Sequence, residues 1–328
     1  MSLIDVEDLQ KTFKIATRQS GRLGALKALV SREYRDVRAV DGVSFALDAG
    51  EMVGYIGPNG AGKSTTIKML TGILVPSGGR IVVDGRVPHQ QRVEHVRQIG
   101  VVFGQRTQLW WDLPTIESFE LLRHIYRLPE ARWRANLDAF TELLDLAPFL
   151  ETPVRQLSLG QRMRADLAAA LLHDPKILFL DEPTIGLDVV AKERIRQFLL
   201  QINRDRGVTV ILTTHDLEDI TRLCQRVVLI DHGRVIYDGG IEQLRARFGH
   251  SRTLVVDFEQ EIRDVQVPFA ALVRREGPRA WLRFERDTTT AAALIAEVSA
   301  RYPVRDLTLE EPAIEGIVRG IYETGSAG

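Results

Sequence analysis

Hydrophobic residues in the middle of the chain form short apolar runs, and stretches with helical spacing separate these runs. Val53 to Ile56, Ile177 to Leu180 and Val208 to Leu212 have the length and the flanking residues of buried β-strands. Strands that alternate with helices along a chain are typical of a parallel sheet with helices packed on it. The pattern therefore predicts an α/β fold with a parallel core.

Apolar and polar residues alternate near the N-terminus, which indicates strands with one buried face. The alternating segments contain Ile4, Val6 and Leu9, then Val43, Phe45 and Leu47, and then Ile81 to Val83. The pair Asp84-Gly85 follows the last of these segments and is a hairpin-turn signal. We therefore expect an antiparallel layer beside the parallel core.

The remaining periodicity divides the chain further. Strand signals disappear between Gln105 and Asp166, where Ile116 to Tyr126 and Ala131 to Leu146 have helical spacing. We expect a helical subdomain at about 106–166 within a first domain of residues 1–240. Residues 241–328 are expected to form a small C-terminal α+β domain. Its strands are expected at Thr253 to Phe258, Trp281 to Phe284 and Val304 to Leu309, and its helices at Thr289 to Arg301 and Pro312 to Tyr322.

Composition narrows the class of protein. Charged residues make up 27% of the 328 residues and the net charge is −1, so we expect no overall attraction to nucleic acid. Cys224 is the single cysteine, which excludes an internal disulfide and fits a reducing compartment. No run approaches the roughly 20 apolar residues of a membrane-spanning helix, and the first residues lack the apolar core of a secretory signal. We therefore expect a cytoplasmic protein.

A glycine-rich loop lies between a predicted strand and a predicted helix. Its sequence is Gly57-Pro58-Asn59-Gly60-Ala61-Gly62-Lys63-Ser64, which matches the phosphate-binding P-loop. Glycines let the backbone N–H groups turn towards phosphate oxygens, and the helix that follows points its positive end at them. Lys63 is expected to reach the terminal phosphates, and the Ser64 hydroxyl to bind magnesium.

Two adjacent carboxylates follow a later buried strand. Ile177 to Leu180 precedes Asp181 and Glu182 directly. One carboxylate can orient a magnesium ion and the other can polarise a water molecule. Together with the P-loop, this pair indicates hydrolysis of a nucleoside triphosphate.

Further motifs resemble those of the ATP-binding cassette (ABC) family. Leu157-Ser158-Leu159-Gly160-Gln161, before a predicted helix, resembles the signature of that family. Gln105 is similar to the Q-loop glutamine, Gly186-Leu187-Asp188 to the D-loop, and Thr213-Thr214-His215-Asp216 to the switch-histidine motif. These matches occur in the order of the family. The resemblance implies a P-loop NTPase fold, with a RecA-like parallel core, an antiparallel β-subdomain and a helical subdomain.

The resemblance also implies a site with ATP and Mg²⁺ as cofactors. Glu182 would polarise the attacking water, His215 would hold the γ-phosphate and this water, and Gln105 would join them as a third catalytic residue. The magnesium ligands would be Ser64, Gln105 and Asp181. The ATP-binding residues would be Phe13, Gly57, Pro58, Asn59, Gly60, Ala61, Gly62, Lys63, Ser64, Thr65 and Thr66. The signature, Leu157, Ser158, Leu159, Gly160 and Gln161, would act on the ATP of a second subunit, beside the D-loop residue Asp188.

Two positions depart from the family pattern. Leu159 replaces the usual middle glycine of the signature, but Ser158 and Gly160 are retained, so we expect hydrolysis to survive. Phe13 is at the place of the adenine-stacking aromatic, although a long segment separates it from Val40-Asp41-Gly42. Tyr34 is the competing candidate.

The resemblance implies partners as well. We expect a second ATPase subunit, in a homodimer or a heterodimer, and separate transmembrane permease subunits that hold the chain at the inner face of the cell membrane. We expect no nucleic acid. Export is favoured because Leu307 to Pro312, before a helix, resembles the C-terminal extension of ATPases in drug and antibiotic exporters. The alternatives are a soluble ABC ATPase that acts on nucleic acid or ribosomes, and a regulatory ABC subunit that hydrolyses ATP poorly.

Two further features could distinguish this chain. Lys11 to Arg38 contains eight Lys or Arg residues, and Leu26, Leu29, Val30, Tyr34 and Val37 fall at helical spacing. This segment is either a basic amphipathic helix at a membrane or partner surface, or an elaborated hairpin on its own domain. Trp110 and Trp111 follow Gln105, and we expect one of them to anchor the membrane subunit.

Overall fold

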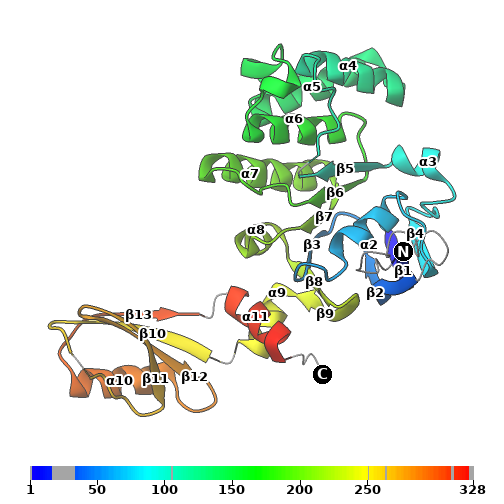
Figure 1. Ribbon diagram of the computed structural model, residues 1–328. Helices are drawn as coiled ribbons and strands as arrows, with labels where there is room; N and C mark the ends of the chain where they lie inside the picture. The colour runs from blue at the N-terminus through cyan, green and yellow to red at the C-terminus, as the bar shows by residue number, and fades with distance from the viewer. Residues whose placement is uncertain are drawn as a thin grey trace, which may run out of the picture. The chain divides into compact units, whose positions relative to one another are not determined.

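The structure is a computed structural model that describes residues 2–16, 34–104, 106–249, 251–262, 264–311 and 314–324. It divides into two compact units, Met1–Asp238 and Gly239–Gly328, and each is described by itself. Unit 1 contains two sheets and a group of helices, and unit 2 contains a third sheet with its own helices (Figure 1).

The larger sheet of unit 1 is the expected parallel core. Its described strands run in the order β5 (Ile99–Phe103), β6 (Ile177–Asp181), β7 (Thr209–Thr213), β3 (Met52–Ile56), β8 (Arg226–Asp231) and β9 (Arg234–Gly240). Neighbouring strands from β5 to β8 are parallel. The apolar runs of β3, β6 and β7 are almost completely buried, as expected for strands covered on both faces. The α/β prediction is confirmed.

The carboxyl ends of three neighbouring strands come together. Phe103 of β5 is in register with Asp181 of β6, and Asp181 is in register with Thr213 of β7. Ligands of open α/β sheets bind at the carboxyl ends of the strands. The loops that carry the predicted chemistry leave the sheet at this edge.

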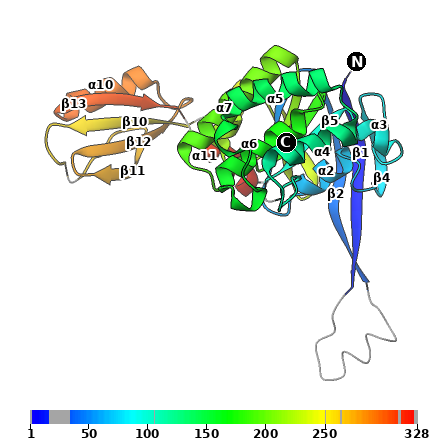
Figure 2. The ribbon, with the colours of Figure 1, turned by 90° about the horizontal axis from the view of Figure 1, so that it is seen from above.

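The second sheet of unit 1 is antiparallel, as predicted, with β1 (Ile4–Ala16) between β2 (Tyr34–Leu47) and β4 (Gly78–Val83). Its buried side chains share one hydrophobic core with the parallel sheet. Helix α2 (Lys63–Leu70) contacts both β2 and β6 and so links the two sheets. Figure 2 shows β1 and β2 running on together as a two-stranded arm.

Of the two interpretations of the segment from Lys11 to Arg38, its described residues agree with the hairpin, and a helix at Tyr34 and Val37 is wrong. Tyr34 and Val37 lie on β2, where they pair with Ala16 and Phe13 of β1. Pairing with β1, the preceding strand, overrides the local spacing. Leu26, Leu29 and Val30 lie outside the described residues, as do the rest of 17–33.

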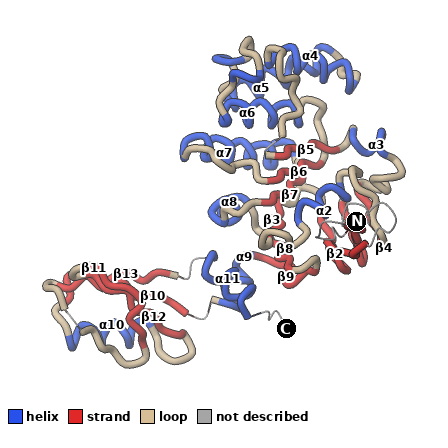
Figure 3. The backbone as a smooth tube through the Cα atoms, viewed as in Figure 1, coloured by secondary structure: helices blue, strands red, loops and turns tan. Residues whose placement is uncertain are grey.

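The helical subdomain forms as predicted, with α4 (Thr115–Tyr126), α5 (Glu130–Leu144) and α6 (Leu159–Leu171) at one end of unit 1 (Figures 1 and 3). Helix α6 contacts α4, α5 and β5, and α5 also contacts α7 (Val189–Arg206). Phe119, Phe140 and Leu144 are fully buried there. Shorter elements of unit 1 are α3 (Arg92–Val96), α8 (Leu217–Leu223) and the 3₁₀ turns Ala147–Phe149 and Val154–Gln156.

A buried carboxylate fastens this subdomain to the segment after β5. Asp166 on α6 is 4% exposed, and its Oδ1 accepts hydrogen bonds from Thr107 Oγ1 at 2.8 Å and from the Gln108 backbone N–H at 3.1 Å. Burial raises the pKa of this carboxyl to about 6, although these hydrogen bonds and the charge of Arg162 act to lower it. The folded protein therefore holds a proton here more tightly than the unfolded chain does.

Asp166→Asn is expected to remove a pH dependence of stability. The wild-type protein should lose stability as pH rises from about 4 to about 6, because the pKa is raised in the folded state. The asparagine keeps an acceptor oxygen and no charge, so the variant should gain about 2 to 3 kcal/mol over the wild type across this range. Urea denaturation at several pH values measures the free energy of unfolding of both proteins. Asp138→Asn, at an exposed position of α5, is the control, and parallel curves for Asp166→Asn and wild type would contradict the prediction.

Unit 2 has an antiparallel sheet in the order β11 (Ala270–Glu276), β12 (Arg279–Glu285), β10 (Ser251–Phe258) and β13 (Val304–Glu310). Helix α10 (Ala291–Arg301) shares a hydrophobic core with one face of it, and α9 (Ile241–Phe248) contacts α11 (Ile314–Thr324). The sequence did not predict β11. This strand is at the sheet edge and is mostly exposed, so it lacks the alternation that marks a strand with one buried face.

None of the described helices is both long enough and apolar enough to span a membrane.

Candidate functional site

The P-loop connects β3 to α2 at the carboxyl edge of the parallel sheet. Gly62 is the N-cap of α2 with φ of 105°, and no side chain caps the first turn of the helix. The N–H groups of that turn are therefore available to a ligand, and a helix N-terminus favours an anion. This geometry suits a phosphate group.

Gly62→Ala is expected to destabilise the protein by about 3 kcal/mol or more. A Cβ at Gly62 would lie 2.4 Å from the backbone oxygen of Ala39, and the φ of +105° is one that side chains rarely adopt. Gly60→Ala is the matched control, because Gly60 has a similar φ of +85° but no atom within 4 Å of its Cβ position. The control should lose only about 1 kcal/mol. Urea denaturation compares the two, and equal losses would contradict the argument from the contact with Ala39.

Lys63 is 8% exposed and folds back over the loop. Its Nζ donates to Gly57 O at 2.6 Å and to Pro58 O at 3.1 Å. Burial lowers the pKa of this ammonium group, whereas the negative charges of Glu182 and Asp181 act to raise it. A hydrogen-bond donor is therefore held at the centre of the loop.

Asp181 ends β6 opposite the start of α2. Its Oδ1 accepts from Ser64 Oγ at 3.4 Å and from Thr213 Oγ1 at 2.5 Å. The Gly104 backbone N–H donates to the backbone oxygen of Asp181 at 2.7 Å. Hydroxyl and carboxylate oxygens are the ligands that magnesium prefers, so Ser64 and Asp181 fit the predicted ion.

Glu182 has a φ of 57°, a left-handed conformation that is uncommon for a residue with a side chain. One carboxylate oxygen, Oε1, lies 3.0 Å from His215 Nε2, and the His215 backbone N–H donates to Oε2 at 3.4 Å. Burial raises the pKa of the Glu182 carboxyl, whereas His215 and Lys63 act to lower it. A partly dehydrated carboxylate beside an imidazole is a suitable general base.

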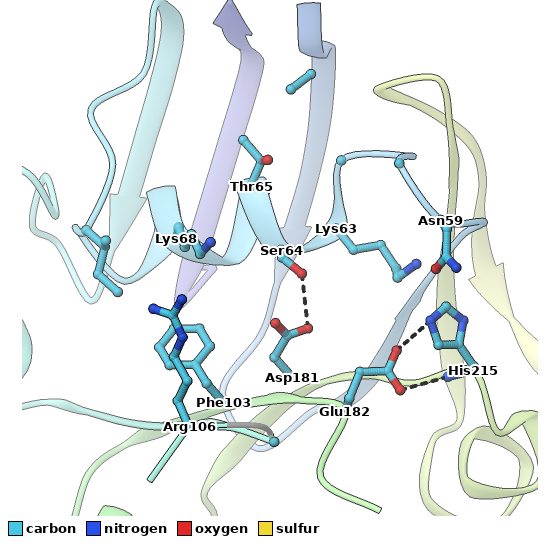
Figure 4. Close-up of a pocket in the computed structure, with 15 residues that line it drawn as sticks. Asn59, Lys63, Ser64, Thr65, Lys68, Phe103, Arg106, Asp181, Glu182 and His215 are labelled. Atoms are coloured by element: carbon cyan, nitrogen blue, oxygen red, sulfur yellow. Dashed lines mark hydrogen bonds and ion pairs between the residues drawn. The ribbon is translucent and has the colours of Figure 1, made fainter. Parts of the chain in front are cut away.

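These side chains face one pocket of about 630 Å³ (Figure 4). Figure 4 shows Ser64 pointing to Asp181, and Glu182 pointing to His215. The predicted site residues in the pocket lining are Asn59, Gly60, Gly62, Lys63, Ser64, Thr65, Asp181, Glu182 and His215. The structure therefore brings together residues that lie more than 150 positions apart in the sequence.

Other predicted site residues lie elsewhere. The described lining does not include Gly57, Pro58, Ala61 or Thr66. Thr66 is fully buried, accepts from Tyr55 OH at 3.2 Å and donates to Gly62 O at 3.2 Å, so it supports the loop from beneath. Gln105 lies outside the described residues.

The adenine-stacking aromatic stays a prediction. Phe13 and Tyr34 are both outside the described lining of the pocket. Lys11 Nζ lies over the Phe13 ring, 5.3 Å from its centroid, and Tyr34 is 54% exposed.

The structure adds residues that sequence reasoning missed. The additional lining residues are Ala39, Lys68, Ile73, Phe103, Gly104 and Arg106. Thr213 was assigned only to the switch motif, but it also binds Asp181. The register of β6 with β7 creates this last contact, and local sequence carries no signal for it.

A second hollow of about 610 Å³ lies at the signature and D-loop. Ser158 begins α6 with a capping box to Gln161, and Asp188 caps α7 through the Ala191 N–H. The hollow is lined by Ser158, Leu159, Gly160, Gln161 and Asp188, whereas Leu157 is buried and is not part of the described lining. Leu159 packs towards Gly186, where a Cβ would lie 3.0 Å from Leu159 Cδ2.

The chain is similar to proteins of a known family. The family described as ABC transporter matches residues 40–185. The Nod factor export ATP-binding protein I of Burkholderia pseudomallei (strain 1710b) is 35% identical over 288 residues, which cover 86% of this chain and 93% of that protein. The daunorubicin resistance ATP-binding protein DrrA3 of Streptomyces coeruleorubidus is 38% identical over 225 residues, which cover 69% of this chain and 71% of that protein.

A solved structure shares the fold as well. It is described as the dimeric structure of a post-hydrolysis state of the ATP-binding cassette MJ0796 bound to ADP and Pi. The TM-score is 0.60 at 27% identity, covering 73% of this chain and 98% of that one. From the site and these relatives, we conclude that the chain belongs to the ABC transporter family as an ATP-binding subunit and is an ATPase of that family.

Proposed function

We propose that two such ATPase subunits bind ATP between them, head to tail, and that hydrolysis drives export through separate permease subunits. One observation carries the proposal: the two hollows of unit 1 have complementary linings. The first contains the P-loop, Asp181, Glu182 and His215, and the second contains the signature and Asp188. Each hollow supplies one half of a complete site.

The chemistry follows from the first half-site. The P-loop and Lys63 would bind the phosphates, and Ser64 and Asp181, together with Gln105, would hold Mg²⁺, which would supply positive charge to neutralise the phosphates. The described residues contain no group of three His, Cys, Asp or Glu side chains arranged for a metal, which fits an ion that keeps waters and phosphate ligands. Glu182 accepts a proton from the attacking water, and His215 orients the water and the γ-phosphate.

Exposed apolar side chains beside the second half-site support contact with another subunit. Val189 is 81% exposed and Val190 is 72% exposed, and both belong to the first turn of α7 after the D-loop. Ile185 in the same loop is 40% exposed. Large exposed apolar side chains that cluster around a hollow are typical of an interface.

A mixing experiment tests the head-to-tail arrangement. Lys63→Ala leaves the signature half intact, and Ser158→Phe leaves the P-loop half intact. We expect each purified variant to be inactive and the mixture to regain ATPase activity, because a mixed dimer holds one site with both normal halves. The specific activity of the wild type should also rise with protein concentration. A mixture without activity, or a rate strictly linear in protein concentration, would contradict the proposal.

The direction of transport rests on the relatives. One is described as a Nod factor export protein and another as a daunorubicin resistance protein. They favour export and do not favour a soluble ATPase that acts on nucleic acid or ribosomes. The chain would then lie at the cytoplasmic face of the membrane through its permease partner.

Trp110 and Trp111 are the proposed anchors for that partner. They are 38% and 50% exposed, and Arg162 lies over the Trp111 ring at 5.7 Å from its centroid. Large aromatic side chains are enriched among residues that dominate interface energetics. We expect Trp110→Ala or Trp111→Ala to reduce copurification with the permease while ATP affinity is retained. Unchanged copurification of both variants would rule out this role.

A further inference from the structure

A buried ion pair lies outside both hollows. Asp219 on α8 is 0% exposed and Arg196 on α7 is 4% exposed. Removing two charges from water is costly unless their hydrogen bonds are satisfied.

The carboxylate of Asp219 is bound on both oxygens. Arg196 Nε and Nη2 each lie 2.6 Å from Oδ1, and Thr184 Oγ1 donates to Oδ2 at 2.5 Å. Thr184 is 2% exposed and comes two residues after Glu182. The ion pair therefore reaches the loop that carries the general base.

The same helix also reaches the residue after His215. Lys192 Nζ donates to Asp216 Oδ2 at 2.6 Å, and Arg196 Nη2 lies 3.9 Å from the same oxygen. Asp216 is also the N-cap of α8, where its Oδ1 accepts from the Glu218 N–H at 3.1 Å. Cations of α7 thus hold the segments that follow both Glu182 and His215.

We propose that Thr184, Lys192, Arg196, Asp216 and Asp219, here named the α7–α8 clamp, set the position of Glu182 relative to His215. The clamp residues are positioning residues, and the inference rests on the proposed roles of Glu182 and His215. Glu182 has a backbone conformation that persists only when its surroundings fix it. Displacement of a reacting group by about 1 Å can cost about 100-fold in rate, so a device that fixes this loop acts directly on hydrolysis.

The clamp also begins next to the D-loop. Asp188 caps α7, and Lys192 and Arg196 lie one and two turns further along the same helix face. A subunit that contacts the D-loop would therefore contact the start of the helix whose side chains bind Asp216 and Asp219. The clamp connects the proposed dimer surface to the reacting groups.

Thr184→Val tests the clamp with a small change of shape. We expect kcat for ATP hydrolysis to fall about tenfold or more, with unchanged affinity for a fluorescent ATP analogue. Thr184→Ser keeps the hydroxyl and should restore kcat. Thr115→Val is the control, because Thr115 is also buried and donates to Thr152 O at 3.1 Å far from the pocket. If Thr184→Val does not fold, Lys192→Met gives the same test at a partly exposed position. Lys192→Arg keeps the positive charge and should restore kcat.

The double variant with Glu182→Gln separates this inference from the proposed function. If the clamp acts through Glu182, adding Thr184→Val should leave the single-turnover rate of Glu182→Gln unchanged. A wild-type rate for Glu182→Gln would overturn the role of Glu182 itself. Two results would overturn the clamp. The first is a normal rate in Thr184→Val although Glu182→Gln has lost activity. The second is a weakened ATP affinity in Thr184→Val that Thr184→Ser does not restore.

Discussion

Glu182→Gln is expected to lower kcat for ATP hydrolysis by about two to four orders of magnitude. The amide is nearly the same size as the carboxylate but cannot accept the proton of the attacking water. ATP affinity should stay close to that of the wild type, because the P-loop and Lys63 are unchanged. Phosphate release in the steady state gives kcat, and a titration with nucleotide gives the affinity.

The control for this variant is Glu120→Gln, which makes the same chemical change at an exposed position of α4. Its rate should equal that of the wild type. Equal rates for Glu182→Gln and wild type would instead favour a regulatory subunit that hydrolyses ATP poorly. Leu159 in the signature is the feature of the sequence that keeps this alternative worth measuring.

Lys63→Ala is expected to weaken ATP binding about 100-fold or more. The buried ammonium group donates to Gly57 O and Pro58 O within the loop and is available to phosphate oxygens at the same place. A hydrogen bond to a charged group contributes about 1.5 to 3 kcal/mol, so the loss of two such bonds to phosphate oxygens would weaken ATP binding by about this factor. Isothermal titration with ATP measures the affinity.

Lys68→Ala distinguishes a specific contact from general attraction. Lys68 also lines the pocket, from the last turn of α2. Its removal lowers the positive charge of the pocket equally but should change the affinity only a few-fold. Equal losses for the two variants would mean that net charge, and not the position of Lys63, determines ATP binding.

The parts of the site that could be predicted from the sequence are local. The P-loop lies directly between β3 and α2, and Asp181 and Glu182 directly follow the apolar run of β6. In each case the strand, the turn and the reacting residue are neighbours in the chain, so a short sequence pattern contains the complete motif. The resemblance to the ABC family, and not the residues alone, then indicated Ser158 and His215 as further parts.

Contacts between distant segments could not be predicted. Thr213 binds Asp181 because β6 and β7 are in register, and Arg196 meets Asp219 because α7 and α8 pack together. The same reason explains the error at Tyr34 and Val37, whose spacing suits a helix although β1 pairs with them as a strand. Register and helix packing arise from the whole fold, and a short sequence window does not contain them.

The contact between Leu159 and Gly186 links two motifs in evolution. Gly186 has a φ of +72°, and a Cβ there would lie only 3.0 Å from Leu159 Cδ2. In descendants of this protein, a side chain at 186 would require Leu159 Cδ2 to move by a few tenths of an ångström, and it would also have to accept a φ that side chains rarely adopt. The cost of a mutation in the D-loop therefore depends in part on the residue that the signature carries at 159.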